Sequence, residues 1–149
     1  MPDTSYGFIG LGNMGGPMCT NLCAAGIVPT VFDAAGTAAR APDGAAVADS
    51  VAAVAQQDTV FLSLPDGRIV ASVCDEIINA ADRRVSTVVD FSTTGPEAAR
   101  EIGARLKHAG ITFVDAPVSG GKAGAIAGTV TVIASGPDAA VAALAGPFD

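Results

Sequence analysis

The 149-residue chain has little positive charge, few aromatic residues and no tryptophan. Its eight lysines and arginines are outnumbered by fifteen acidic residues, giving a net charge of −7 at pH 7. They are spread thinly and form no stripe that could neutralise a row of phosphates, so we expect no nucleic-acid partner. The longest apolar runs are strand-length and fall short of the roughly 20 residues of a membrane span. We therefore expect no membrane association.

Cysteine and histidine are also scarce. Cys19, Cys23 and Cys74 form no C-x-x-C pair, which is typical of reduced thiols with a structural role. The single histidine, His108, falls at the end of an expected helix, so we predict no metal site. The first five residues contain no basic segment of the kind that opens a signal peptide, which favours a cytoplasmic location.

Alanine and glycine are abundant, and strand-like and helix-like segments alternate along the chain. Apolar residues at helical spacing predict helices over 14–25 and 70–81, start and stop signals predict a third over 94–110, and the alanine-rich segment 36–57 allows two short helices around a turn. In the third helix Thr94 and Glu97 suggest a capping box, with Pro96 in the first turn. Short apolar runs predict strands over residues 6–10, 28–33, 59–65, 85–92, 111–117 and 128–135.

This alternation predicts one α/β domain, doubly wound around a mostly parallel sheet with helices on both faces. Ligands bind such sheets beyond the carboxyl ends of the strands. The loops that follow the strands should therefore meet at one rim; they begin at Gly10, Asp33, Pro65, Ser92 and Ala116.

A G-x-G-x-x-G pattern, formed by Gly10, Gly12 and Gly15, joins the first expected strand to the first helix. Among 18 glycines the pattern alone is weak, but in this position it is typical of a turn that holds a dinucleotide pyrophosphate at a helix N-terminus. Asp33 follows 21 residues after Gly12, where an acid accepts hydrogen bonds from the adenosine ribose. It favours NAD over NADP, since a 2′-phosphate would meet like charge. The alternative is a structural turn with Asp33 capping the next helix.

Four segments together resemble the β-hydroxyacid dehydrogenase family, which includes 3-hydroxyisobutyrate dehydrogenase: "GFIGLGNMGGPM", "LSLPDG", "DFSTTGP" and "DAPVSGGKAGAIAGTVTVIASG". 6-Phosphogluconate dehydrogenase is a more distant relative. The resemblance implies a Rossmann-type domain whose NAD contacts come from Gly10, Leu11, Gly12, Asn13, Met14, Gly15, Asp33, Leu64, Pro65 and Thr93. Ile69 departs from the asparagine that some NAD-dependent members have there.

The same resemblance implies a substrate site and a catalytic lysine. Ser119, Gly120 and Gly121 would bind the carboxylate of a β-hydroxy acid. In the family a lysine exchanges the hydroxyl proton, and it lies in a second, all-helical domain. In this protein we expect that lysine beyond Asp149.

We therefore expect residues 1–149 to be a dinucleotide-binding domain that ends before the helical domain, with no catalytic residue of its own. Lys122 is a poor candidate for the base, because that position in the substrate loop varies in residue type among relatives. The full-length enzyme is expected to form homo-oligomers.

Two alternatives remain open at this point. One is a dinucleotide-binding module without chemistry, although such a module would not need a carboxylate site at Ser119. The other is an imine reductase built on the same scaffold.

Overall fold

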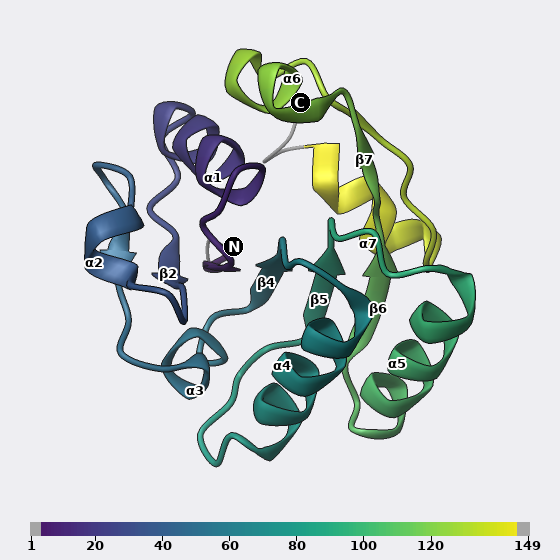
Figure 1. The fold of residues 1–149 in the computed structure, drawn as a ribbon. Coiled ribbons are helices and arrows are strands. Elements are labelled where there is room, and N and C mark those ends of the chain that lie inside the picture. The colour runs from purple at the N-terminus through teal and green to yellow at the C-terminus, as the bar shows by residue number, and fades with distance from the viewer. Residues whose placement is uncertain (1–3, 146–149) are drawn as a thin grey trace.

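A six-stranded parallel sheet forms the centre of the protein in the computed structural model, which describes residues 4–145 (Figure 1). Across the sheet the strands follow the order β3-β2-β1-β4-β5-β6, so the chain first builds one half outward from β1 and then the other half from β4. The strands are β1 (Tyr6–Ile9), β2 (Thr30–Phe32), β3 (Ala46–Val47), β4 (Thr59–Leu62), β5 (Thr87–Asp90) and β6 (Thr112–Asp115). The doubly wound arrangement predicted from the sequence is confirmed.

Helices cover both faces of this sheet, as expected. One face packs against α3 (Val51–Val54), α4 (Gly67–Asn79) and α5 (Pro96–His108). The other carries α1 (Gly15–Ala24), α6 (Gly121–Ala127) and α7 (Asp138–Ala142), and a short 3₁₀ turn, Ala143–Ala145, follows α7. The remaining helix, α2 (Thr37–Arg40), lies beside β2 and β3 at the edge (Figure 1).

Side chains of the central strands are buried on both faces, which explains their nearly continuous apolar runs. In β4, Val60 and Leu62 belong to the core under α3, α4 and α5, while Phe61 points to the opposite face. There Phe61 stacks between Tyr6 and Phe91, with ring centroids 5.7 and 5.5 Å apart. Tyr6, Phe8, Phe61 and Phe91 thus lie on the α1 side of the sheet, while Phe32 and Phe113 pack on the other side.

The region from residue 116 to 135 differs from the sequence prediction. In place of a loop and one long strand there are two short strands, β7 (Val118–Ser119) and β8 (Thr131–Val132), paired antiparallel in a separate sheet with α6 between them. The segment 36–57 does form two short helices, but it also forms the edge strand β3. Two-residue strands have no periodicity to detect, because their hydrogen-bonding partners define them.

The capping box predicted for α5 is wrong. Its N-cap is Gly95, at φ 89°, with no side-chain cap, and the Thr94 hydroxyl instead donates to Asp90 Oδ2 at 2.6 Å. A hydrogen bond to a carboxylate is stronger than the neutral bond that a capping hydroxyl would accept from a backbone N–H. Pro96 does occupy the first turn, as expected.

Candidate functional site

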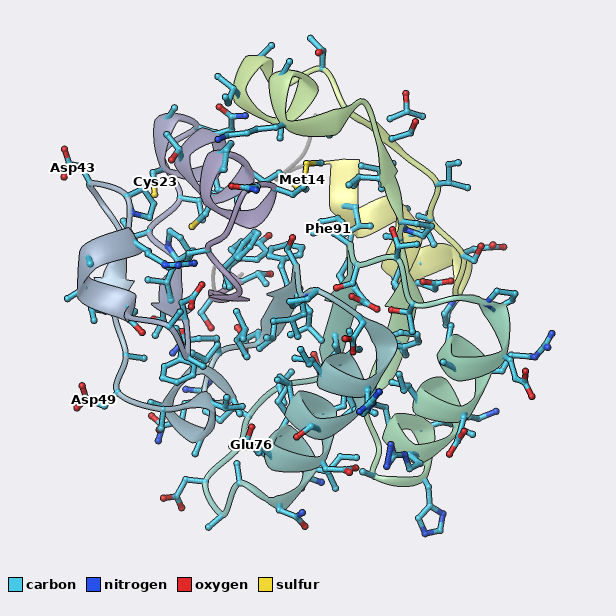
Figure 2. All side chains as sticks on the ribbon, viewed as in Figure 1. Met14, Cys23, Asp43, Asp49, Glu76 and Phe91 are labelled. Atoms are coloured by element: carbon cyan, nitrogen blue, oxygen red, sulfur yellow. The ribbon has the colours of Figure 1, made fainter. Side chains whose placement is uncertain are left out.

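A cleft of about 550 Å³ opens at the carboxyl ends of the strands, where the order reverses between β1 and β4. Segments that follow β1, β2, β4, β5 and β6 contribute to its walls, the last through Val118, so all five loops expected at this rim meet there. Met14 and Phe91, both labelled in Figure 2, line it from the loops after β1 and β5. The predicted cofactor residues in its lining are Gly10, Gly12, Asn13, Met14, Gly15, Asp33, Leu64, Pro65 and Thr93. Leu11 is buried and lines a neighbouring pocket instead.

The three glycines of the first loop are required for different reasons. Gly10 has φ 101°, and a Cβ there would lie 2.0 Å from the carbonyl oxygen of Ser63. A Cβ on Gly15 would lie 1.9 Å from the carbonyl oxygen of Gly10. Gly12 has no positive φ, and a Cβ on it would meet no protein atom within 4 Å. Backbone packing therefore explains Gly10 and Gly15 but leaves Gly12 unexplained.

Asp33 joins the end of β2 to this glycine loop. Its Oδ2 accepts a hydrogen bond from the Leu11 N–H at 2.7 Å, and its Oδ1 accepts one from the Ala35 N–H at 2.8 Å. The guanidinium of Arg40, seven residues on, lies 3.7 Å from Oδ2. The N-cap of α2 is Gly36, so the alternative in which Asp33 caps that helix is wrong.

A buried polar network lies beneath the loops that follow β4 and β5. Asp90 and Ser92 are 0% and 4% exposed, and within residues 4–145 they are the buried polar residues of the core. Burial raises the pKa of Asp90, while hydrogen bonds from Ser92 and Thr94 act in the opposite direction. Asp115 pairs in register with Asp90, and its pKa is raised by its own burial and then by the Asp90 charge. Sequence analysis missed this network, although an acid ending the apolar run "TVVD" was a visible signal.

The predicted substrate residues lie beside the cleft but do not line it. Ser119 is an exposed residue of β7, and Gly120 and Gly121 begin α6 with φ 130° and 64°. Val118, immediately before them, does line the cleft. The structure therefore brings this segment to the rim without placing the three residues in the cleft wall.

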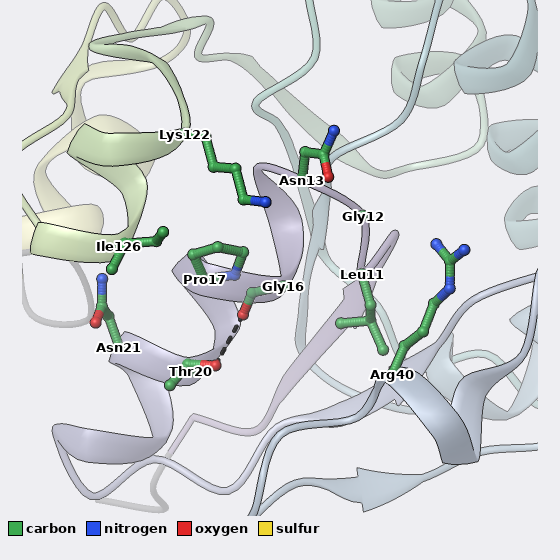
Figure 3. A pocket seen from close by; sticks show the side chains of 10 residues that line it. All are labelled: Leu11, Gly12, Asn13, Gly16, Pro17, Thr20, Asn21, Arg40, Lys122 and Ile126. Carbon is green, nitrogen blue, oxygen red and sulfur yellow. Dashed lines mark hydrogen bonds between the residues drawn. The ribbon is translucent and has the colours of Figure 1, made fainter.

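A second pocket of about 510 Å³ lies between α1 and α6 (Figure 3). Lys122 lines this pocket and not the cleft, and in Figure 3 its side chain extends toward α1. The two helices are joined by Asn21, whose amide donates to the carbonyl oxygen of Ala125 at 2.7 Å. That Lys122 is not the catalytic base stays a prediction.

The expected catalytic lysine stays a prediction. It was assigned to a segment beyond Asp149, and Asp149 itself lies outside the described residues 4–145.

The thiols are buried or partly buried, as expected of structural cysteines. Burial raises the pKa of Cys19 and of Cys74 to about 12, so both stay protonated at neutral pH. Across residues 4–145 no group of three or more His, Cys, Asp or Glu side chains is placed to hold a metal ion. Within the same range, no helix combines the length and the apolar character needed to cross a membrane.

A glycine-rich turn that leads into α1, with an acid at the end of β2 and both at the switch point of a doubly wound sheet, defines a Rossmann-type dinucleotide-binding domain. Comparison with known proteins makes the assignment more specific. The family model described as the NAD binding domain of 6-phosphogluconate dehydrogenase matches residues 5–149, and the chain belongs to that family.

Relatives found by sequence comparison indicate one group within the family. A probable 3-hydroxyisobutyrate dehydrogenase of Mycobacterium tuberculosis is 43% identical over 136 residues, which are 89% of this chain and 46% of that protein. An NAD-dependent L-serine dehydrogenase of Pseudomonas aeruginosa is 40% identical over 137 residues, which are 87% of this chain and 45% of that protein. The chain thus spans about half the length of these relatives.

Solved structures agree with this grouping. The M. tuberculosis 3-hydroxyisobutyrate dehydrogenase with L-serine superposes with a TM-score of 0.88 at 37% identity, covering 99% of this chain and 51% of that one. An imine reductase from Myxococcus stipitatus in complex with NAD⁺ has a TM-score of 0.84 at 20% identity, covering 98% of this chain and 51% of its own. At that identity the second likeness concerns the fold alone.

Proposed function

We propose that this chain is the cofactor-binding part of an NAD-dependent β-hydroxyacid dehydrogenase. The main support for this proposal comes from Gly12. Neither backbone conformation nor packing within the protein requires glycine there, yet Gly12 lies in the cleft wall at the start of α1. A side chain at this position would project into open space, and a dinucleotide pyrophosphate approaching the helix N-terminus needs that space.

The residues of the cleft suit the other parts of the cofactor. Asp33 has the position and charge to accept hydrogen bonds from the adenosine ribose, Leu64 and Pro65 supply apolar surface, and Thr93 supplies an exposed hydroxyl for the nicotinamide ribose. When bound, the nicotinamide ring would accept or donate the hydride. The protein's part is to bind and orient it.

Asp33 supports NAD as the preferred cofactor. Both of its oxygens already accept internal hydrogen bonds, so the carboxylate is held at the end of β2, and a 2′-phosphate there would meet its negative charge. Arg40 partly offsets that charge, but it stays 45% exposed at 3.7 Å. NADH should therefore bind more tightly than NADPH.

The substrate is proposed to be a small β-hydroxy acid. The names of the relatives support this class, since 3-hydroxyisobutyrate and L-serine each carry a carboxylate and a β-hydroxyl. Ser119, Gly120 and Gly121 are the proposed carboxylate-binding residues, and the lysine that exchanges the hydroxyl proton is assigned to a helical segment beyond Asp149. Homo-oligomer formation and a cytoplasmic location are proposed for the full-length enzyme from the family resemblance.

A titration of the chain with NADH, followed by fluorescence, tests the cofactor proposal. Wild type should bind, Gly12→Ala should bind at least about 10-fold more weakly because the new methyl group occupies pyrophosphate space, and its thermal midpoint should be unchanged. Gly103→Ala is the matched control, because Gly103 lies on α5, outside the cleft lining, and the three atoms nearest to its Cβ would all belong to the Phe113 side chain, the closest at 3.2 Å. Equal NADH binding by wild type and Gly12→Ala would contradict the proposal.

Two further measurements address specificity and chemistry. Tighter binding of NADPH than of NADH would overturn the argument from Asp33. Steady turnover of 3-hydroxyisobutyrate or L-serine by this chain alone would overturn the assignment of the base to a segment outside it.

A non-catalytic dinucleotide-binding module is the second candidate. It is favoured by one observation, the absence of Ser119 from the cleft wall. If the full-length protein turns over a β-hydroxy acid, and Ser119→Ala reduces that turnover by raising KM, the non-catalytic module is excluded.

A further inference from the structure

One buried carboxyl group connects the two loops that form the middle of the cleft. Asp90, the last residue of β5, is fully buried and does not line the cleft. Its Oδ1 accepts a hydrogen bond from the Ser92 N–H at 2.9 Å, and its Oδ2 accepts one from the Thr94 hydroxyl at 2.6 Å. These two donors stand on either side of Thr93, so the chain on both sides of that residue is fixed.

The network continues into the neighbouring loop. The Ser92 hydroxyl oxygen accepts a hydrogen bond from the Leu64 N–H at 2.8 Å, and Leu64 and Pro65 belong to the loop after β4. Three hydrogen bonds thus connect Asp90 to both loops. Leu64, Pro65, Ser92 and Thr93 all line the cleft, while Asp90 and Thr94 lie behind them.

Packing alone does not account for an acid at this position. The two preceding residues of β5, Val88 and Val89, are apolar and fully buried, and burying a carboxyl group is costly unless hydrogen bonds compensate. A fully satisfied buried network favours one arrangement of its members over others. The consequence here is a single arrangement of the two loops.

We propose that Asp90 is a positioning residue that arranges the loops after β4 and β5 for the nicotinamide half of the cofactor before it binds. This rests on the proposed function, because it assigns those loops to the cofactor. A preformed site loses less conformational freedom on binding, so affinity depends on the network even though Asp90 touches no ligand. The adenosine half, bound near Asp33, does not depend on it.

Comparing NADH with ADP separates positioning from a general loss of stability, because ADP lacks the nicotinamide half. Thr94→Val removes one hydrogen bond while keeping the side-chain shape, and Thr94 is outside the cleft wall. It should weaken NADH binding about 3- to 10-fold and change ADP binding less than about 2-fold. Ser86→Ala is the control. It removes a hydroxyl that donates a hydrogen bond to the Asp58 carbonyl oxygen, at the opposite end of β5 from Asp90, and it should change neither NADH binding nor ADP binding.

Variants of Asp90 supply a rescue test. Asp90→Asn retains an acceptor for the Ser92 N–H and gains a donor for the Thr94 oxygen, so it should bind NADH within about 3-fold of wild type. Asp90→Val removes both hydrogen bonds and should lose at least as much NADH affinity as Thr94→Val. If Asp90→Val does not fold, the comparison of Thr94→Val with Asp90→Asn still stands.

The outcomes are distinct. Wild-type NADH affinity in Thr94→Val, or an equal loss of NADH and ADP affinity, overturns the positioning role and leaves the proposed function intact. If the wild-type chain binds neither NADH nor ADP, both the positioning role and the proposed function are overturned.

Discussion

The two glycine-rich loops of this protein use glycine in different ways. In the first, Gly10 and Gly15 allow backbone segments to approach so closely that a Cβ would lie about 2 Å from a carbonyl oxygen. In the second, Gly120 and Gly121 have positive φ, and a Cβ on Gly121 would meet nothing within 4 Å. Close packing is most severe in the first loop, where Gly10 also has a positive φ, whereas the second loop depends chiefly on backbone conformation.

This difference suits different tasks. Close packing against β4 gives the first loop one shape, which a pyrophosphate site at the start of a ten-residue helix requires. The second loop leads into the seven-residue helix α6, and large apolar side chains around it, Ile126 and Ile133, are about 60% exposed. Its conformation is therefore less constrained by the rest of the domain.

Gly15→Ala should have the largest effect on stability. Its new methyl group would overlap the backbone oxygen of Gly10, which no side-chain movement can relieve. We expect the free energy of unfolding to fall by about 3 kcal/mol or more, measured by urea denaturation. A loss below about 1 kcal/mol would show that the first loop is not held by close packing.

Gly121→Ala should have a smaller effect, because its methyl group has open space and only the φ of 64° is unfavourable. The expected loss is about 1 to 2 kcal/mol in the same measurement. A loss as large as that of Gly15→Ala would remove the distinction between the loops.

Asp115→Asn, at the end of β6 just before the second loop, should change the free energy of unfolding least of the three, and should raise it at neutral pH. The pKa values of Asp115 and Asp90 are raised in the folded protein, so the folded state keeps protons that the unfolded chain releases above a pKa of about 3.9. Stability is then lost as pH rises from that value through the folded pKa. Asp115→Asn should be more stable than wild type at about pH 7 and equal to it near about pH 3, measured by urea denaturation across that range.

Asp58→Asn is the control for this pH series. The pKa of Asp58 is lowered, chiefly by the hydrogen bond from the Ser5 N–H, so its carboxylate stabilises the fold above the unfolded pKa. This variant should be less stable than wild type at about pH 7. If both variants are more stable than wild type at about pH 7, or if neither is, the directions assigned to the two pKa shifts are contradicted.

Much of the architecture was predictable because long elements have periodic signals. The parallel sheet, α1 and α4 were expected from apolar spacing, α5 from Pro96 and Gly110 at its ends, and the glycine turn and Asp33 from their places after strands. The short elements β3, β7, β8 and α6 were not expected in these forms, because two to seven residues carry no clear period. Thr94 was assigned to a helix cap because local sequence cannot show a competing acceptor such as Asp90.

The doubly wound fold, the glycine turn and the acid at the end of β2 could be predicted from the amino-acid sequence, since each depends on residues near one another in the chain. Three facts required the folded structure: a Cβ on Gly12 would meet no protein atom within 4 Å, Lys122 extends toward α1, and Asp90 connects two loops. These facts depend on which segments meet at the carboxyl edge of the sheet. Contacts between segments that are far apart in the sequence cannot be recognised from the pattern of neighbouring residues.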